Sequence, residues 1–402
     1  MILIFGHYPI EEYQTILLNS KSGAQFAADA LQWSFITGFE ENNILPKIIN
    51  LPYIGSFPKR YSKLFYETNK LCYTFNNNTY ASYKFCNLSL YKMISRYYVT
   101  KKSLFNDFNN KHNTQTLVIY SVSTPFLKAA IDYKRKFALT KICVIVADLP
   151  EFMSDSKNIL YRLLKNIDGN NVNKYLRQVD AFVLLSENMK ERLPINNKPY
   201  VVVEGIYNKH DEVDNFEEIS NVKQILYSGT LAYRYGIMNL VHAFSKIKND
   251  NYRLVICGDG DSKEEIIELS QKDSRINYLG SLKREEVLKL QKQSSLLVNP
   301  RTPEGEFTKY SFPSKTMEYL ASGTPTLLYK LPGIPDEYYN FCFTVEKLGI
   351  DELAYKIDEI LSKSDKELKE IGDKAREFIL EKKNPKVQCA KVIDMINQLC
   401  SG

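Results

Sequence analysis

The segment 312–325, with the sequence "FPSKTMEYLASGTP", predicts a loop, a short helix and a turn into a strand. Pro313 precedes the expected helix, and Ser314 is suited to be its N-cap residue. The first N–H groups of a helix have no partner within the helix, so its N-terminus is suited to bind an anion. If an anion binds here, the neighbouring motifs are candidates for parts of the same ligand site; if none binds, they are ordinary turns and surface residues.

Two side chains of this helix admit two interpretations. Lys315 and Glu318 are three positions apart, so they share one face of the helix. They can form a simple surface ion pair, which contributes about 0.2–0.5 kcal/mol. Alternatively, the helix N-terminus and nearby cations hold a diphosphate while Glu318 accepts hydrogen bonds from a ribose diol. A carboxylate suits a diol because it offers two acceptors to two donors.

Short apolar runs rich in Val, Ile and Leu alternate with helical patterns along most of the chain, which predicts parallel sheets covered on both faces. The runs are "ILIFG", "TLVIYS", "KICVIVAD", "AFVLLS" and "YVVVEG", followed by "QILYSG", "RLVICGDG", "SLLVNP" and "TPTLLY". An acidic, polar segment at 208–223 separates the two series. The length of 402 residues also favours two domains. We therefore predict an α/β protein with two doubly wound, Rossmann-like domains at 1–207 and 208–383, and a ligand cleft between them. A last helix over 384–402 is expected to return to the first domain.

Composition excludes several classes of protein. The seven cysteines are scattered without a C-x-x-C pair, which is typical of free thiols in a reducing cytosol. No apolar run approaches the roughly 20 residues that cross a bilayer, and the N-terminus lacks the pattern of a signal peptide. We therefore expect a cytoplasmic protein. The net charge of +6 is too small to indicate nucleic-acid binding by itself.

Glycines follow three expected strands of the second half. Gly229 ends the first of these strands, Gly258 the second and Gly280 the third, with Ser281 next to it. Arg234, on the loop after Gly229, is a fork of donors suited to phosphate oxygens, or a solvated surface residue. The segment "CGDGDS" lacks the third glycine of a dinucleotide-binding fingerprint. Its two aspartates fit a glycine-rich turn better than a divalent metal site.

In the first half, Gly23 precedes a helix and either approaches a phosphate or sugar closely or simply opens that helix. Asp148 and Glu151 follow a buried strand, where acidic groups can bind sugar hydroxyls or cap a helix. Both interpretations stay open.

The segment 57–111 carries ten Lys and Arg residues against two acidic ones, interleaved with Tyr and Phe. This composition fits contact with an anionic membrane surface, since rings lodge among headgroups while cations attract phosphates. Helices with a basic solvated face would look similar, and single-stranded nucleic acid is a weaker alternative. The residues expected to contact the membrane are Lys59, Arg60, Lys63, Arg96, Lys101 and Lys102.

Taken in order, "YSGTL…RYGI", "LVICGDG", "INYLGSL" and "YSFPSKTMEYLASGTP" resemble the family-4 retaining glycosyltransferases of the GT-B fold, and most of all the bacterial branch that builds surface polysaccharides. The resemblance covers about 222–365 well and the first half loosely. It implies a site for a nucleotide-sugar donor, with UDP-hexose favoured. The implied donor-binding residues are Gly229, Thr230, Gly258, Gly280, Ser281, Tyr310, Phe312, Ser314 and Glu318.

The sequence departs from this family at three places. The first of two glutamates eight positions apart falls at Tyr310, while the second matches Glu318. An arginine and a lysine of the family fall at Thr230 and Tyr235, so Arg234 is expected to bind the diphosphate, helped by Lys315. A histidine common in the first domain falls at Ala147, which leaves Asp148 as the polar candidate there.

The resemblance implies transfer of a hexose, with retention of configuration and without a metal or other cofactor, catalysed by Arg234, Lys315 and Asp148. Gly23 and Glu151 would lie on the acceptor or sugar side. If the acceptor is linked to a lipid, the basic segment 57–111 would hold the protein at the inner face of the plasma membrane as a peripheral protein. Nucleic acid is not expected as a partner. A catalytically silent GT-B subunit that binds a partner enzyme or a glycan is the alternative, and a nucleotide-sugar epimerase is a third.

Overall fold

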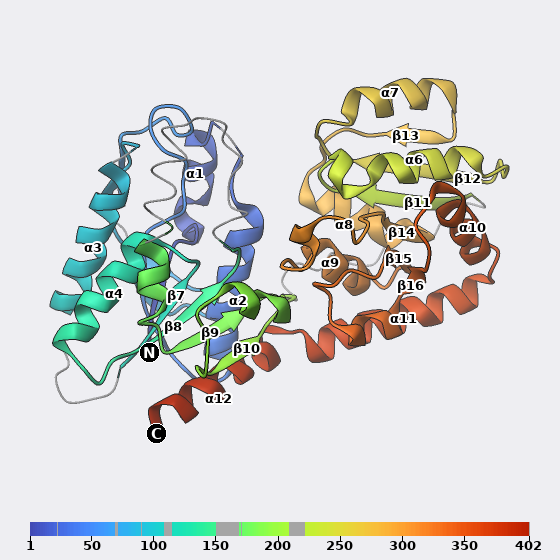
Figure 1. The fold of residues 1–402 in the computed structure, drawn as a ribbon. Coiled ribbons are helices and arrows are strands. Elements are labelled where there is room, and N and C mark those ends of the chain that lie inside the picture. Colours follow the sequence, from blue (N-terminus) through green and yellow to red (C-terminus); the bar gives the residue numbers. More distant parts are fainter. Residues whose placement is uncertain are drawn as a thin grey trace. The chain divides into compact units, whose positions relative to one another are not determined.

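The computed structural model describes residues 1–21, 23–68, 71–89, 91–107, 115–149, 169, 171–208 and 222–401. The chain divides into two compact units. Unit 1 comprises Met1–Ile206 and Pro385–Gly402, and unit 2 comprises Tyr207–Asn384. The last helix, α12 (Pro385–Ser401), therefore belongs to unit 1, where it packs against α2 (Phe26–Glu41) (Figure 1).

Unit 1 is built on an eight-stranded sheet in the order β10-β9-β8-β7-β1-β2-β5-β4. Six neighbouring strands of this sheet run parallel; five of them coincide with the predicted apolar runs, and the sixth, β2, was not predicted. These are β1 (Ile2–Phe5), β2 (Lys47–Asn50), β7 (Thr116–Tyr120), β8 (Lys141–Val146), β9 (Ala181–Leu184) and β10 (Tyr200–Val202). Helices of this unit also include α1 (Tyr13–Asn19), α3 (Tyr91–Asp107) and α4 (Thr124–Lys136).

One edge of this sheet departs from the parallel prediction. β5 (Thr79–Ser82) adds parallel to β2, and β4 (Leu71–Tyr73) then pairs with it antiparallel. A separate antiparallel pair joins β3 (Phe65–Tyr66) to β6 (Phe85–Cys86). β3, β4 and β5 mix exposed with buried residues, so they leave no continuous apolar run that sequence patterns detect.

Unit 2 contains a six-stranded, wholly parallel sheet in the order β13-β12-β11-β14-β15-β16. Its strands are β11 (Lys223–Ser228), β12 (Tyr252–Cys257), β13 (Ile276–Tyr278), β14 (Leu296–Asn299), β15 (Thr326–Tyr329) and β16 (Phe343–Val345). The helices are α6 (Ile237–Lys246), α7 (Lys263–Lys272), α8 (Arg284–Gln293), α9 (Ser314–Ser322), α10 (Ile350–Leu361) and α11 (Asp365–Lys382) (Figure 1).

Apolar side chains cover both faces of the unit 2 sheet. Ile225 and Tyr227 of β11 join the larger core cluster, whereas Leu226 between them joins a second cluster with Tyr319 of α9. Neighbouring residues of a strand point to opposite faces, so both faces are buried. The strand order changes direction between β11 and β14. Ligands of such sheets bind at the carboxyl ends of the two strands on either side of this position.

An aromatic cluster closes the loop after β1 in unit 1. His7 is fully buried, with its ring centroid 4.5 Å from that of Trp33 and 5.0 Å from that of Tyr80. Neither ring nitrogen of His7 has a hydrogen-bond partner among the described residues. Burial lowers the pKa of His7 to about 3, so the imidazole is neutral near pH 7. Trp33 anchors the loop, since its Nε1 donates to the Tyr8 carbonyl at 3.2 Å.

Arg96 corrects one prediction for the basic segment. It was expected at a membrane, but it is only 2% exposed. Its guanidinium donates to the carbonyls of Leu51 (2.6 Å) and Pro52 (2.9 Å) and lies over the ring of Tyr53. The side chain thus joins α3 to the chain just after β2. Charge and spacing alone do not distinguish such a buried cation from an exposed one on the same helix.

Candidate functional site

The glycines that follow three strands of unit 2 meet at one edge of the sheet. The Gly229 N–H donates to the Cys257 carbonyl, and the Gly258 N–H donates to the Gly280 carbonyl, both at 2.9 Å. Each loop therefore hydrogen-bonds to the next. The carboxyl ends of β11, β12 and β13 are joined into one surface, as expected for adjacent parallel strands.

A pocket of about 500 Å³ opens at this edge, between the ends of β11 and β14. Its size is that of a small-molecule site. Six predicted residues line it, namely Gly229, Thr230, Gly258, Ser281, Ser314 and Lys315. Further lining residues, which were not predicted to bind the donor, include Tyr227, Ser228, Tyr235, Asp259, Leu282, Val287, Asn299, Arg301 and Tyr319. We call this the β11–β14 pocket.

The helix of the opening segment begins at the wall of this pocket. α9 starts at Ser314, after Pro313, so Ser314 is the first helical residue rather than the N-cap that we predicted. Pro313 brings a fixed φ of −71° but no side-chain cap. The Thr316 N–H already donates to the Pro313 carbonyl at 2.9 Å. The N–H groups of Ser314 and Lys315 are thus the ones that a ligand in the pocket can use.

Tyr319 fixes α9 to the end of β11. Its hydroxyl accepts from the Ser228 N–H at 2.9 Å and donates to the Ser228 carbonyl at 3.2 Å. Tyr319 is 1% exposed, so these bonds are shielded from water. The helix N-terminus is therefore held in place before any ligand arrives.

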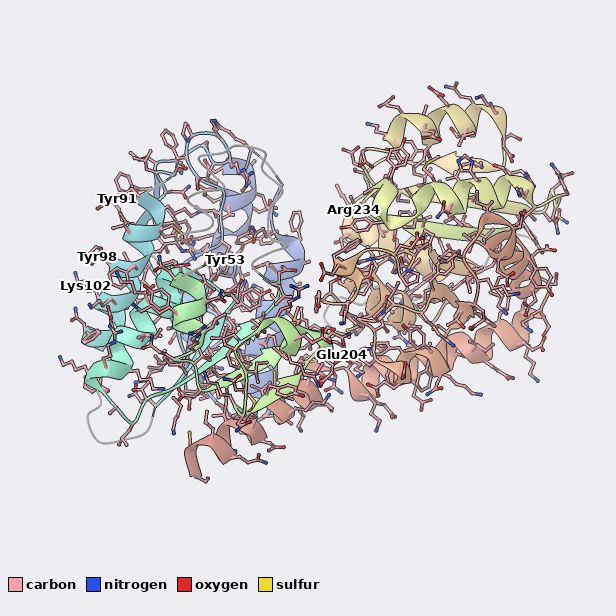
Figure 2. The ribbon with its side chains drawn as sticks, viewed as in Figure 1. Tyr53, Tyr91, Tyr98, Lys102, Glu204 and Arg234 are labelled. Carbon is pink, nitrogen blue, oxygen red and sulfur yellow. The ribbon has the colours of Figure 1, made fainter. Side chains whose placement is uncertain are left out.

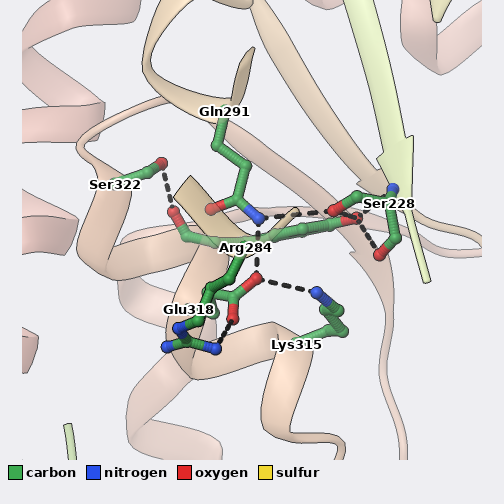
Figure 3. A network of polar contacts seen from close by, with 7 residues as sticks. Ser228, Arg284, Gln291, Lys315, Glu318 and Ser322 are labelled. Atoms are coloured by element: carbon green, nitrogen blue, oxygen red, sulfur yellow. Dashed lines mark hydrogen bonds and ion pairs between the residues drawn. The ribbon is translucent and has the colours of Figure 1, made fainter. Parts of the chain in front are cut away.

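Glu318 lies one turn behind the pocket wall in a polar network (Figure 3). Its Oε1 accepts from Lys315 Nζ at 2.8 Å and from Gln291 Nε2 at 2.7 Å, and its Oε2 lies 3.3 Å from Arg284 NH1. Burial alone would raise the pKa of Glu318, but Lys315, Arg284 and Gln291 together hold it below its ordinary value. Glu318 is therefore an anion at neutral pH. The ion pair between Lys315 and Glu318, which the sequence suggested as the simpler interpretation, is present. It forms one part of this larger network.

Two predicted donor residues lie away from the pocket. Tyr310 is 4% exposed and Phe312 is 9% exposed, and neither lines it. The Phe312 ring packs on that of Tyr338 in the unit 2 core, with centroids 5.2 Å apart. Both side chains are buried, so neither of them contributes to the wall of the β11–β14 pocket. Gly280 is also absent from the lining, although its carbonyl supports Gly258.

Arg234 is an exposed residue of the short 3₁₀ helix Tyr233–Tyr235 and does not line the pocket (Figure 2). Its guanidinium carbon lies 5.1 Å from the centroid of the Tyr235 ring. The guanidinium that does line the pocket is that of Arg301, two residues after β14. Sequence analysis missed Arg301 because a single arginine in a polar loop has no distinguishing pattern.

The predicted residues of unit 1 are less closely gathered. Asp148, just after β8, is exposed, yet partial loss of hydration raises its pKa. Gly23, before α2, has a left-handed φ of +37° and open space where a Cβ would be. Glu151 lies outside the described residues. Asp29, which was not predicted, accepts from the Tyr8 N–H at 2.6 Å, and burial raises its pKa to about 7.

No group of three or more His, Cys, Asp or Glu side chains that could hold a metal occurs in the described part of the chain. In the same part, no helix has the length and apolar character needed to span a bilayer. All seven cysteines are free thiols.

Two Rossmann-like α/β units in one chain, with the last helix returning to the first unit, define the GT-B fold. Solved structures of this fold match over nearly the whole chain. Sucrose-phosphate synthase from Thermosynechococcus elongatus matches with a TM-score of 0.60 and 14% identity, covering 100% of both chains. Anabaena HepE in complex with UDP matches with a TM-score of 0.63 and 11% identity, covering 99% of this chain and 100% of the other. An Escherichia coli trehalose-6-phosphate structure bound with UDP-2-fluoro glucose matches with a TM-score of 0.66 and 12% identity, covering 100% and 99%.

Sequence comparisons match glycosyltransferases. Residues 209–378 match the family model of the glycosyl transferases group 1. An uncharacterized glycosyltransferase of Methanocaldococcus jannaschii is 28% identical over 203 residues, which are 45% of this chain and 50% of that protein. The matched region thus spans half the length of that relative. The chain carries a GT-B fold whose second unit resembles the group 1 glycosyltransferases.

Proposed function

We propose that this protein is a retaining glycosyltransferase that moves a hexose from a nucleoside-diphosphate sugar, with UDP-hexose favoured, to a lipid-linked or glycan acceptor in the synthesis of a bacterial surface polysaccharide. One observation carries the proposal. The N-terminus of α9, with Ser314 and Lys315, opens into the β11–β14 pocket, and the anionic Glu318 lies one turn behind it. A diphosphate suits the first feature and a ribose diol suits the second.

The proposed chemistry uses groups that are fixed before the donor binds. The bond between the sugar and the diphosphate breaks, and the acceptor hydroxyl loses its proton as its oxygen bonds to the same sugar carbon. Negative charge therefore grows on the nucleoside diphosphate that leaves. The free N–H groups at the start of α9 would stabilise this charge without reorganising. Lys315 would then exchange its Glu318 partner for phosphate oxygens. The similarity to structures bound with UDP or UDP-2-fluoro glucose supports the choice of donor class.

Calorimetric binding of UDP, GDP and ADP tests the donor site. We expect one of them to bind the wild type, and Glu318→Ala to weaken that binding by about 10- to 100-fold, because hydrogen bonds to a charged acceptor contribute about 1.5–3 kcal/mol. Glu285→Ala is the matched control, because Glu285 is an exposed carboxylate in the first turn of α8. Equal affinities for wild type and Glu318→Ala would remove Glu318 from the site. If the wild type bound none of the three, the silent-subunit alternative would replace the enzyme.

We also propose that α3 contacts an anionic membrane, where a lipid-linked acceptor would reside. Tyr91, Ile94, Tyr98 and Lys102 follow one another at helical spacing, and the first three are 51%, 49% and 63% exposed. Figure 2 shows Tyr91, Tyr98 and Lys102 in a row along α3. Rings and an alkyl side chain beside a lysine fit the interface between headgroups and acyl chains. Lys59, Arg60 and Lys63 are also exposed, whereas Lys101 pairs with Asp132 at 3.1 Å.

Vesicle flotation tests this surface. We expect the wild type to float with vesicles of phosphatidylglycerol and phosphatidylcholine at low salt, and the double variant Tyr98→Ser/Lys102→Glu to lose at least half of the floating fraction. Lys272→Glu in α7 is the control, since it makes the same charge change at an exposed position of unit 2. A wild type that stayed with the soluble fraction would contradict the membrane role.

A further inference from the structure

Arg301 is a buried cation in the wall of the β11–β14 pocket. It is 9% exposed and follows β14 at the point where the strand order of unit 2 changes direction. Its NH2 donates to Ser311 Oγ at 3.0 Å, but its Nε has no partner, and it forms no ion pair with a carboxylate among the described residues. Burying a charge without such a partner is costly. The buried Arg96 offsets this cost by donating to two backbone carbonyls, whereas an anion in the pocket could offset it for Arg301.

Aromatic rings hold this guanidinium in position. Its central carbon lies 4.4 Å from the ring centroid of Phe307 and 5.4 Å from that of Tyr235. The turn after Tyr235 is packed tightly against the start of this loop. Gly236 has a φ of +77°, and a Cβ there would lie 2.2 Å from the Pro300 carbonyl oxygen. Arg301 is thus fixed by its surroundings rather than free to move into the solvent.

The other charged groups of the pocket wall are already engaged. Lys315 pairs with Glu318, and Asp259 accepts from the Gly260 N–H at 3.0 Å. Burial lowers the pKa of Arg301, and the nearby Arg234 acts in the same direction. Both effects favour a bound anion, because an anion would restore lost solvation and offset the repulsion between the two guanidinium groups.

We infer that Arg301 is the guanidinium that binds the phosphates of the ligand, in the role that sequence analysis gave to Arg234. The inference rests on the proposed function for the identity of that ligand, a nucleoside diphosphate. A planar fork of donors can bind two phosphate oxygens at once. The Tyr235 ring lies beside both Arg301 and Arg234. The exposed Arg234 is therefore close enough to add a long-range attraction for the phosphates.

Calorimetry with three probes tests this assignment: the nucleoside diphosphate that binds best, its nucleoside, and inorganic pyrophosphate. We expect Arg301→Met to weaken nucleoside-diphosphate binding by about 30- to 100-fold and to abolish pyrophosphate binding, while nucleoside affinity stays within about twofold. Arg234→Gln, the matched control, is expected to weaken diphosphate binding less than about fivefold, as an exposed cation does. Without ligand, Arg301→Met should melt at the wild-type temperature or above it, since it removes a buried unpaired charge.

The outcomes separate this inference from the proposed function. Unchanged diphosphate affinity in Arg301→Met, or an equal loss for the nucleoside, would overturn the role of Arg301 and leave the function standing. A third outcome is that the wild type binds pyrophosphate but no nucleoside diphosphate, and that Arg301→Met loses the pyrophosphate binding. This outcome would support the phosphate-binding role of Arg301 and overturn the proposed function. A wild type that bound neither probe would overturn both. If Arg301→Met did not fold, Arg301→Lys would replace it in the test. We expect Arg301→Lys to lower the affinity for the nucleoside diphosphate by about five- to tenfold and to leave the affinity for the nucleoside unchanged.

Discussion

Replacing Gly258 by alanine is expected to lower the free energy of unfolding of unit 2 by about 3 kcal/mol or more. Gly258 has a φ of +141°, which L-residues with a side chain rarely adopt. An added Cβ would lie 1.8 Å from the Gly229 carbonyl oxygen and 2.9 Å from its carbon. These are backbone atoms of the neighbouring loop and cannot rotate away. Backbone strain and overpacking each cost about 1–3 kcal/mol, and here they act together.

Gly280→Ala is the matched control for this experiment. Gly280 also has a positive φ, of +70°, but no atom lies within 4 Å of the Cβ that alanine would add. Only the left-handed conformation is then unfavourable, at about 1–2 kcal/mol. Urea unfolding of the two variants, followed by far-ultraviolet circular dichroism, compares the effects. Equal midpoints for Gly258→Ala and Gly280→Ala would show that the close approach of the two loops is unimportant.

Arg96→Gln is expected to lower the free energy of unfolding of unit 1 by about 3 kcal/mol. The substitution removes a guanidinium that donates to the Leu51 and Pro52 carbonyls and is surrounded by the rings of Tyr53 and Phe126, 4.7 and 4.8 Å from its carbon. Buried carbonyls left without donors cost about 1–3 kcal/mol, and the lost packing adds to this.

Hydrogen exchange of the peptides that contain β2 and α3 measures this effect region by region. Lys102→Gln is the control, because Lys102 is an exposed residue of the same helix and is expected to change stability by less than about 0.5 kcal/mol. Wild-type protection in Arg96→Gln would mean that the buried cation contributes nothing to the joint between α3 and the sheet.

The α/β fold was predictable because most of its strands are buried on both faces. Such strands leave runs like "KICVIVAD" and "RLVICGDG", and each run that we singled out contains a strand of the structure. The edge of the unit 1 sheet was not predictable, because β4 and β5 alternate exposed and buried residues over only three and four positions. Pairing of such strands is decided by tertiary contacts that the local sequence does not show.

The lining of the β11–β14 pocket was predictable where strand ends and a helix start form it. Gly229, Gly258, Ser314 and Lys315 border the pocket because strand ends and helix starts have recognisable sequences. Side-chain direction was harder to predict. Arg234 precedes the expected helix and is exposed, while Arg301, some 70 residues later, lines the pocket. Only the parallel pairing of β11 with β14 brings these two loops together, and no local pattern encodes that pairing.

The aromatic cluster around His7 gives the protein a built-in optical reporter. Trp33 is the only tryptophan among the 402 residues, and it is 6% exposed. Its neighbour His7 stays uncharged over the usual working range of pH, so it does not become a protonated quencher. Fluorescence excited at wavelengths that only tryptophan absorbs therefore comes from unit 1, and unit 2 contributes no emission of its own. Any change of that emission when a nucleotide is added would have to arise from an event in unit 1, with no label attached.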